Sequence, residues 1–209
     1  MTQGSCRDTS EMGPRRNPVA VPPLSDEFYE NAKKLIARYP QGRARSALLP
    51  LLYLVQSEHG FVSPEGQRAI AEILGLSHAE VAAVSTFYTM FKRTPQGKWL
   101  ISVCTQPACS LAGAKEIVAR LQERLGIANG ETTDNGMISL EEVECLCVCD
   151  GAPVVAVNYE NYEKIAVEEA VDLVVRLMQG EAPPPASRGD VPPDFAAVNR
   201  RMSGLEAPR

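Results

Sequence analysis

Two short clusters of cysteine constrain this chain more than any other feature of its sequence. Cys104 and Cys109 form the first cluster, and Cys145, Cys147 and Cys149 form the second, with 35 residues between them. The clusters are far apart in sequence and similar in density. We therefore expect folding to bring them together into one site.

The cysteines call for an explanation other than disulfide bonds. The N-terminus MTQGSCRDTSEMGPRRN has no apolar segment of the kind found in secretory signals, so we expect a cytoplasmic protein. That compartment keeps thiols reduced. No stretch approaches the ~20 apolar residues of a membrane span. The net charge of −5 argues against nucleic acid as the main partner.

Composition and periodicity divide the chain into four segments. Residues 1–24, which include Cys6 and lack periodicity, are predicted to be a disordered leader. Residues 25–95 are predicted to be a helical domain, and residues 96–180 a domain of strands and helices. Residues 181–209 begin with Glu-Ala-Pro-Pro-Pro and are predicted to be a disordered tail.

Apolar spacing and capping residues predict a bundle of four helices in the first domain. Ser25, Ser63 and Ser77 are the expected N-caps, and Ser77 with Glu80 fits a capping box. The predicted helices span residues 26–38, 44–58, 64–74 and 78–90.

The second domain is predicted to alternate strands and helices. Strands are expected at residues 99–103, 138–144, 153–157 and 162–165, and helices at 112–125 and 167–178. Residues 129–135 are expected to be a polar loop. This order indicates a thioredoxin-like α/β sandwich, so the fold class of the whole chain is predicted to be α+β.

The residue types in the two clusters fit an iron–sulfur site. A 2Fe–2S cluster needs four thiolates, two on each iron, and a pair on each of two loops supplies them. Structural zinc also takes four thiolates, but typically from C-x2-C knuckles, and a thioredoxin-type redox pair wants C-x-x-C. Neither pair here has that spacing, although zinc remains an alternative. The second cluster offers three thiols for two places, and spacing alone does not choose between them.

The flanking residues resemble a known family. The string CTQPACSLAGA at 104–114, then ECLCVCDGAP at 144–153 with Asn158, is similar to the NuoE-type, 24-kDa subunit of respiratory complex I. So are STFYTMF at 85–91 and EHGFVS at 58–63. The resemblance covers about residues 25–178. It implies that one 2Fe–2S cluster is held by Cys104, Cys109, Cys145 and Cys149. The family usually has Gly where this chain has Cys147.

The resemblance also implies a role. The chain would be an electron-transfer subunit of the enzyme NADH:quinone oxidoreductase and would not be catalytic alone. It would exchange single electrons with FMN on an NADH-binding flavoprotein partner. Other subunits of the peripheral arm would hold it on the cytoplasmic side of the inner membrane. Related domains occur in NAD-reducing hydrogenases and NAD-dependent formate dehydrogenases, so these are alternatives. An alternative of another class is a zinc-stabilised interaction module.

Few other residues compete for a functional role. The only histidines are His59, at a predicted helix end, and His78, beside a predicted cap, and both are interpreted as structural or solvated. Phe87, Tyr88 and Phe91 are interpreted as core or as an interface.

Overall fold

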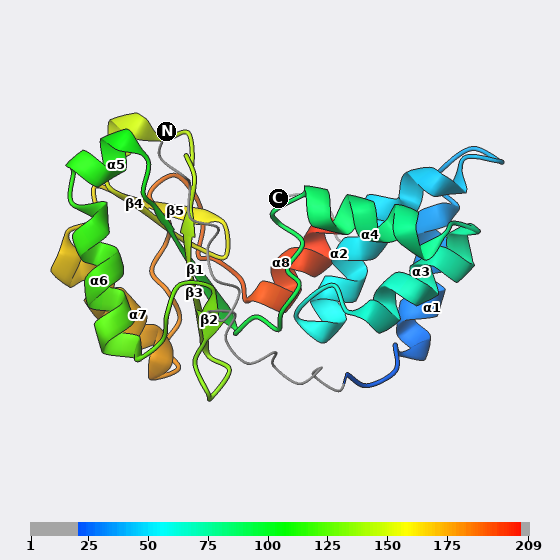
Figure 1. Ribbon diagram of the computed structural model, residues 1–209, viewed down its shortest axis with the longest axis horizontal. Coiled ribbons are helices and arrows are strands. Elements are labelled where there is room, and N and C mark those ends of the chain that lie inside the picture. Colours follow the sequence, from blue (N-terminus) through cyan, green and yellow to red (C-terminus); the bar gives the residue numbers. More distant parts are fainter. Residues whose placement is uncertain (1–20, 206–209) are drawn as a thin grey trace, which may run out of the picture.

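The computed structural model describes residues 21–205 (Figure 1). The predicted leader at 1–24 and Cys6 lie almost wholly outside the described residues, as does the end of the predicted tail at 206–209. A helical half and a half built on a β-sheet lie side by side, and helix α8 lies between them in the view of Figure 1. The predicted α+β class is confirmed.

Serine caps position the helices of the first half. The side chains of Ser25, Ser63 and Ser77 each accept a hydrogen bond from a backbone N–H in the first turn, and Ser77 forms the full capping box with Glu80. The helices are α1 (Asp26–Ile36), α2 (Leu48–His59, preceded by the 3-10 turn Ala44–Ala47), α3 (Pro64–Leu74) and α4 (His78–Phe87). All four predicted helices are therefore present.

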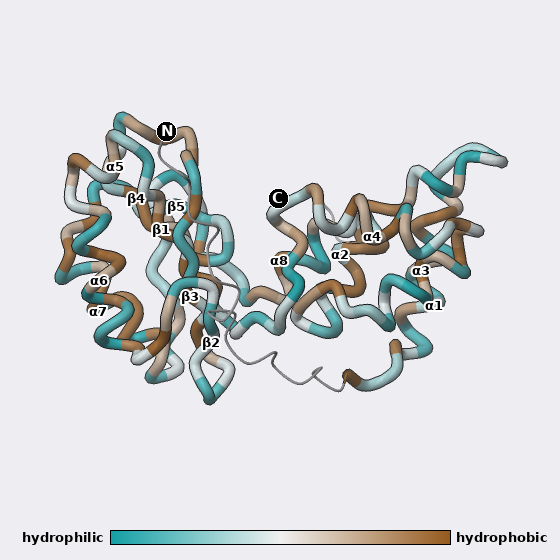
Figure 2. The backbone as a smooth tube through the Cα atoms, viewed as in Figure 1, coloured by the Kyte–Doolittle hydropathy of each residue, from teal (hydrophilic) through white to brown (hydrophobic). Residues whose placement is uncertain are grey.

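One apolar core holds this half together. Its fully buried side chains include Phe28, Leu35, Leu51, Val55 and Ile70, which project from α1, α2 and α3. Figure 2 shows the hydrophobic residues gathered along the inner sides of these helices. Burying an apolar side chain of this size contributes roughly 1.5–3 kcal/mol to the stability of the fold. Helix α2 is apolar on most sides and forms the centre of the bundle.

The second half is built on a five-stranded sheet in the order β2-β3-β1-β4-β5. Its strands are β1 (Trp99–Cys104), β2 (Glu131–Thr132), β3 (Ile138–Val143), β4 (Val154–Val157) and β5 (Glu160–Glu163). Strand β1 runs parallel to β3 and antiparallel to β4. All six residues of β1, the central strand of the sheet, are buried.

Helices α6 (Ala114–Leu125) and α7 (Val167–Met178) cover one face of the sheet (Figure 1). Ile117, Leu121, Val174 and Leu177 from these helices pack with alternate residues of β1, β3 and β4 in a second apolar core. Two short elements differ from expectation. Residues 107–111 form helix α5 (Pro107–Leu111) ahead of α6, and β2 lies within the predicted polar loop. Both are too short for hydrophobic periodicity to indicate them.

The prediction of a disordered tail is wrong for residues 181–205. This C-terminal segment comes after α7 in the chain and runs alongside β5. It then crosses to the helical half and ends in α8 (Phe195–Met202), which packs against α2. The Asp194 side chain caps α8 by accepting from the N–H of Ala197. Phe195 and Asn199 are buried. The sequence did not predict this helix, because the segment begins with a proline-rich stretch. The helix is ordered by contacts with residues far away in the chain rather than by its local sequence pattern.

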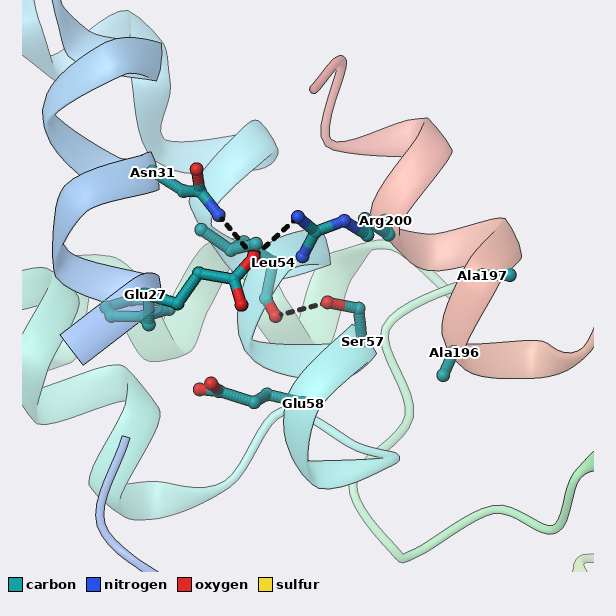
Figure 3. Close-up of a pocket in the computed structure, with 9 residues that line it drawn as sticks. Glu27, Asn31, Leu54, Ser57, Glu58, Ala196, Ala197 and Arg200 are labelled. Atoms are coloured by element: carbon teal, nitrogen blue, oxygen red, sulfur yellow. Dashed lines mark hydrogen bonds and ion pairs between the residues drawn. The ribbon is translucent and has the colours of Figure 1, made fainter. Parts of the chain in front are cut away.

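Polar contacts fasten α8 to the helical half. The Gln56 Nε2 amide, fully buried in α2, donates to Asn199 Oδ1 at 2.7 Å and to Met90 O at 2.9 Å. A pocket of about 230 Å³ lies between α1, α2 and α8, and at its edge Arg200 donates to Glu27 Oε1 at 2.7 Å (Figure 3). Arg200 also holds the pKa of the Glu27 carboxyl below its ordinary value. Since the C-terminal segment contacts both halves, the domain boundary near residue 95 stays a prediction.

Candidate metal centre

The strand pairing brings the two cysteine clusters to one edge of the sheet. Cys104 is the last residue of β1 and lies opposite Val143, the last residue of β3. Because β1 and β3 are parallel, their carboxyl ends meet at the same edge. Cys145 follows two residues after Val143, so the second loop begins beside the end of the first.

The first pair, Cys104 and Cys109, is buried, each residue being only 3% exposed. Pro107 starts the short helix α5 at its first turn, and Cys109 lies within that helix. We expected Cys109 in a loop before a helix starting near residue 112, and that expectation is wrong. Burial, together with the hydrogen bond between Cys109 and the Cys104 sulfur, raises the pKa of Cys109 to about 11. These thiols must lose their protons to bind a metal.

The second pair, Cys145 and Cys149, is exposed, and its two Sγ atoms lie 3.9 Å apart. Two thiolates on one tetrahedral metal with bonds of about 2.3 Å lie about 3.8 Å apart. The Cys147 N–H donates to Cys145 Sγ at 3.3 Å and lowers the pKa of Cys145. The neighbouring Cys145 thiol raises the pKa of Cys149. The spacing of this pair therefore already fits a single metal ion.

The two pairs are within electrostatic reach of each other. Charge at Cys104 raises the pKa of Cys149, and charge at Cys149 contributes to the raised pKa of Cys109. Within residues 21–205, no three His, Cys, Asp or Glu side chains gather closely enough to hold one metal ion. A two-iron cluster needs two thiolates on each iron, so two pairs of soft sulfur donors at one sheet edge fit it.

Comparison with known proteins decides the family. Residues 32–178 match the model of the thioredoxin-like [2Fe-2S] ferredoxin family. The chain belongs to this family.

Two relatives are named as subunits of an NADH-quinone oxidoreductase. It is 42% identical over 195 residues to an NADH-quinone oxidoreductase subunit of Mycobacterium tuberculosis, covering 93% of this chain and 75% of the relative. It is 41% identical over 137 residues to an NADH-quinone oxidoreductase subunit of Thermus thermophilus, covering 66% of this chain and 76% of the relative.

A solved structure shares the fold. A chain of the NAD+-reducing [NiFe]-hydrogenase in the H2-reduced state aligns with a TM-score of 0.56 and 20% identity. The alignment covers 65% of this chain and 23% of that one, so the present chain corresponds to a small part of the hydrogenase chain.

Cys147 departs from the glycine expected in this ferredoxin family, and its backbone explains that expectation. Its φ is 61°, in the left-handed region that glycine adopts without strain. The Cys147 thiol is exposed and lies 3.8 Å from the carbonyl oxygen of Cys145, while its N–H points at the Cys145 sulfur. The loop conformation therefore uses the backbone of Cys147 rather than its thiol.

The remaining candidate residues lie away from the cysteines. His59 Nδ1 lies 2.7 Å from Ser63 Oγ at the end of α2, and His78 is the first residue of α4. Of the aromatic group, Phe91 is buried, whereas Phe87 is 77% exposed. Sequence reasoning missed Arg188, which lies in the C-terminal segment and bonds Asp150 beside Cys149. Only its positive charge could have suggested it, in a stretch predicted to lack structure.

Proposed function

We propose that the chain is the 2Fe–2S electron-transfer subunit of an NADH:quinone oxidoreductase. One observation carries the proposal: two pairs of thiols meet at one sheet edge, with the Cys145 and Cys149 sulfurs 3.9 Å apart. The names of the relatives in Mycobacterium and Thermus support the choice of complex. The chain is then part of an oxidoreductase without being catalytic alone.

The proposed ligands are Cys104, Cys109, Cys145 and Cys149. The choice within the second loop is supported by the sulfur–sulfur distance of the outer two thiols and by the placement of the Cys147 thiol near a carbonyl group. It is also supported by the resemblance of the motif, in which the central position is usually glycine. Cys147 would remain a free thiol beside the site.

The residues around the thiols would set the properties of the site. When bound, the cluster supplies an acceptor and donor of single electrons. The backbone N–H groups of Cys147 and Val154 donate to the sulfurs of Cys145 and Cys109, and such bonds stabilise negative charge on sulfur. The buried first pair keeps water away from one side. The exposed second pair, with Leu111 91% exposed nearby in α5, leaves the other side open to a partner.

The partner that fits is a flavoprotein. FMN and NADH would bind to that subunit, and the present chain would exchange electrons with the flavin one at a time. Within residues 21–205, no helix has both the length and the apolar character to cross a membrane. We propose that the chain reaches the cytoplasmic side of the inner membrane through the peripheral-arm subunits of the complex.

Recovery of the chain from its own cell, under anaerobic conditions and with an affinity tag, tests this proposal. We expect a flavoprotein and FMN to co-purify, and NADH to produce the electron paramagnetic resonance (EPR) signal of a reduced 2Fe–2S cluster. Co-purification of nickel with hydrogen-dependent reduction would assign the chain to a hydrogenase. Formate-dependent reduction would assign it to a formate dehydrogenase. Recovery with zinc and no flavin would contradict the electron-transfer role.

A further inference from the structure

The C-terminal segment is held along β5 beside the second cysteine loop. Tyr162 donates its hydroxyl to Pro184 O at 2.6 Å, and the Ser187 N–H donates to Asn161 O at 2.9 Å. In return, Ser187 Oγ accepts from the Glu163 N–H at 2.8 Å. The segment is therefore bonded to the strand at Pro184 and at Ser187. Because these bonds fix its backbone, the side chain of Arg188, the residue after Ser187, has a defined position.

Arg188 links the cysteine loop to the strand. Its Nη2 donates to Asp150 Oδ2 at 2.9 Å and to Glu163 Oε2 at 2.8 Å, and its Nε lies 2.5 Å from Glu163 Oε1. Asp150 follows Cys149 directly in the chain. A planar guanidinium can hold two carboxylates at once with fixed geometry, which a lysine ammonium does not reproduce.

The turn that follows Cys149 is shaped to receive this contact. Residues Cys149–Gly151 form a 3-10 turn, and the Lys164 N–H donates to Gly151 O at 2.7 Å. A Cβ atom at Gly151 would collide with the Glu163 carboxylate, so only glycine leaves room for that side chain. Glu163 is thereby packed against the turn, with its side chain 12% exposed, and Arg188 closes over it.

We propose that Arg188 is a positioning residue for the cluster, holding the Cys149 turn against β5 and placing a permanent positive charge beside it. This inference rests on the proposed role of Cys149 as a ligand. Reduction adds negative charge to the cluster, and a nearby cation favours the more negative state. The Arg188 side chain is 61% exposed, so its ion pairs contribute little to global stability and the effect belongs to the site.

The test compares reduction potentials of full-length variants carrying the cluster, titrated with dithionite and monitored by EPR. Arg188→Gln should lower the equilibrium constant for one-electron reduction roughly fivefold, or about 41 mV at 59 mV per tenfold. It should also broaden the EPR signal and speed cluster loss to a chelator. Arg188→Lys should keep the potential closer to that of the parent but still speed the loss. The matched control is Arg176→Gln, which removes the same charge from an exposed Arg–Glu pair with an N···O distance of 2.7 Å.

Each outcome decides the proposal. A changed potential and a faster loss in Arg188→Gln, with Arg176→Gln like the parent, support it. Equal potentials and loss rates in Arg188→Gln and the parent overturn it. A global loss of helical circular dichroism in Arg188→Gln and Arg188→Lys also overturns it, since Arg188 would then act on the whole fold. Failure of Arg188→Gln to hold a cluster while its helical circular dichroism stays like that of the parent supports it. A parent protein without a 2Fe–2S signal overturns the proposed function instead.

Discussion

At the scale of single residues, the backbone and the side chain of Cys147 in the second cysteine loop have different roles. Cys147 lies between the proposed ligands Cys145 and Cys149 with a φ of 61°, and its N–H donates to the Cys145 sulfur at 3.3 Å. Any residue that tolerates this conformation supplies the same N–H. Sequence spacing could not show which two of the three thiols are ligands. The direction of the Cys147 thiol, which only the structure gives, favours Cys145 and Cys149.

Serine variants of the three cysteines test this assignment. Cys145→Ser and Cys149→Ser should each lower the iron and acid-labile sulfide content several-fold or shift the EPR g-values, because a hydroxyl is a harder donor than a thiolate. Cys147→Ser, which keeps the backbone N–H, should leave both contents unchanged and is the matched control. A cluster lost in Cys147→Ser and retained in Cys149→Ser would reverse the assignment.

A second residue, Asn158, joins three parts of the chain. Its Oδ1 accepts from the Leu100 N–H at 2.8 Å, and its Nδ2 donates to Lys98 O at 3.1 Å and Pro193 O at 2.9 Å. Asn158→Ala should lower the free energy of unfolding by about 2–4 kcal/mol, because buried backbone groups lose their partners and alanine is strained at a φ of 47°.

Asn158→Gly separates these two contributions. It loses the same bonds but adopts a positive φ without strain, so it should be less destabilised than Asn158→Ala by about 1 kcal/mol. Urea unfolding followed by circular dichroism measures both variants. A loss below about 0.5 kcal/mol in Asn158→Ala would show that the amide contributes little.

At the scale of elements, α8 depends on partners rather than on its own sequence. The buried Gln56 amide shares one N–H with Asn199 and the other with Met90 O. Asn199→Ala should leave that buried donor without a partner and cost about 1–3 kcal/mol. Amide hydrogen exchange should then rise mainly in residues 195–202. Ala196→Gln, an exposed change on the same helix, is the control, and equal exchange in both variants would contradict the role of Asn199.

The same dependence explains which elements the sequence could predict. Helices α3 and α7 were predicted with their bounds, because the Ser63 cap and apolar spacing specify α3 and an apolar stripe specifies α7. Strand β1 was predicted because a short, mostly apolar run leads into Cys104. Helix α5, strand β2 and helix α8 were not, since the first two are short and the third is ordered by Gln56, far away in sequence. The cysteines were predicted to meet, while Arg188 was hidden in a supposed tail.

At the scale of the whole molecule, two apolar cores are joined by polar contacts. Lys92 Nζ pairs with Glu141 Oε2 at 2.6 Å, and the Ser102 hydroxyl donates to Glu141 Oε1 at 2.8 Å. Glu141 therefore connects the helical half to the sheet, because it contacts both Lys92 and Ser102. Only one of the two cores, that of the sheet half, includes the proposed ligands Cys104 and Cys109.

Metal removal should therefore affect the halves unequally. Chelation should lower the melting temperature and raise amide exchange in residues 104–111 and 144–151, where thiolate ligands hold otherwise short or irregular backbone. Exchange in the core of α2 should stay within about twofold of that of the parent, because its apolar packing contains no proposed ligand. A uniform rise across both halves would mean that the cluster supports the fold as a whole.

The most direct test of the central claim is the iron and acid-labile sulfide content of the anaerobically purified chain, measured together with zinc. The account predicts a reddish-brown protein with about two irons and two sulfides per chain, giving a rhombic EPR signal after reduction. Colourless protein holding stoichiometric zinc and lacking sulfide would contradict it.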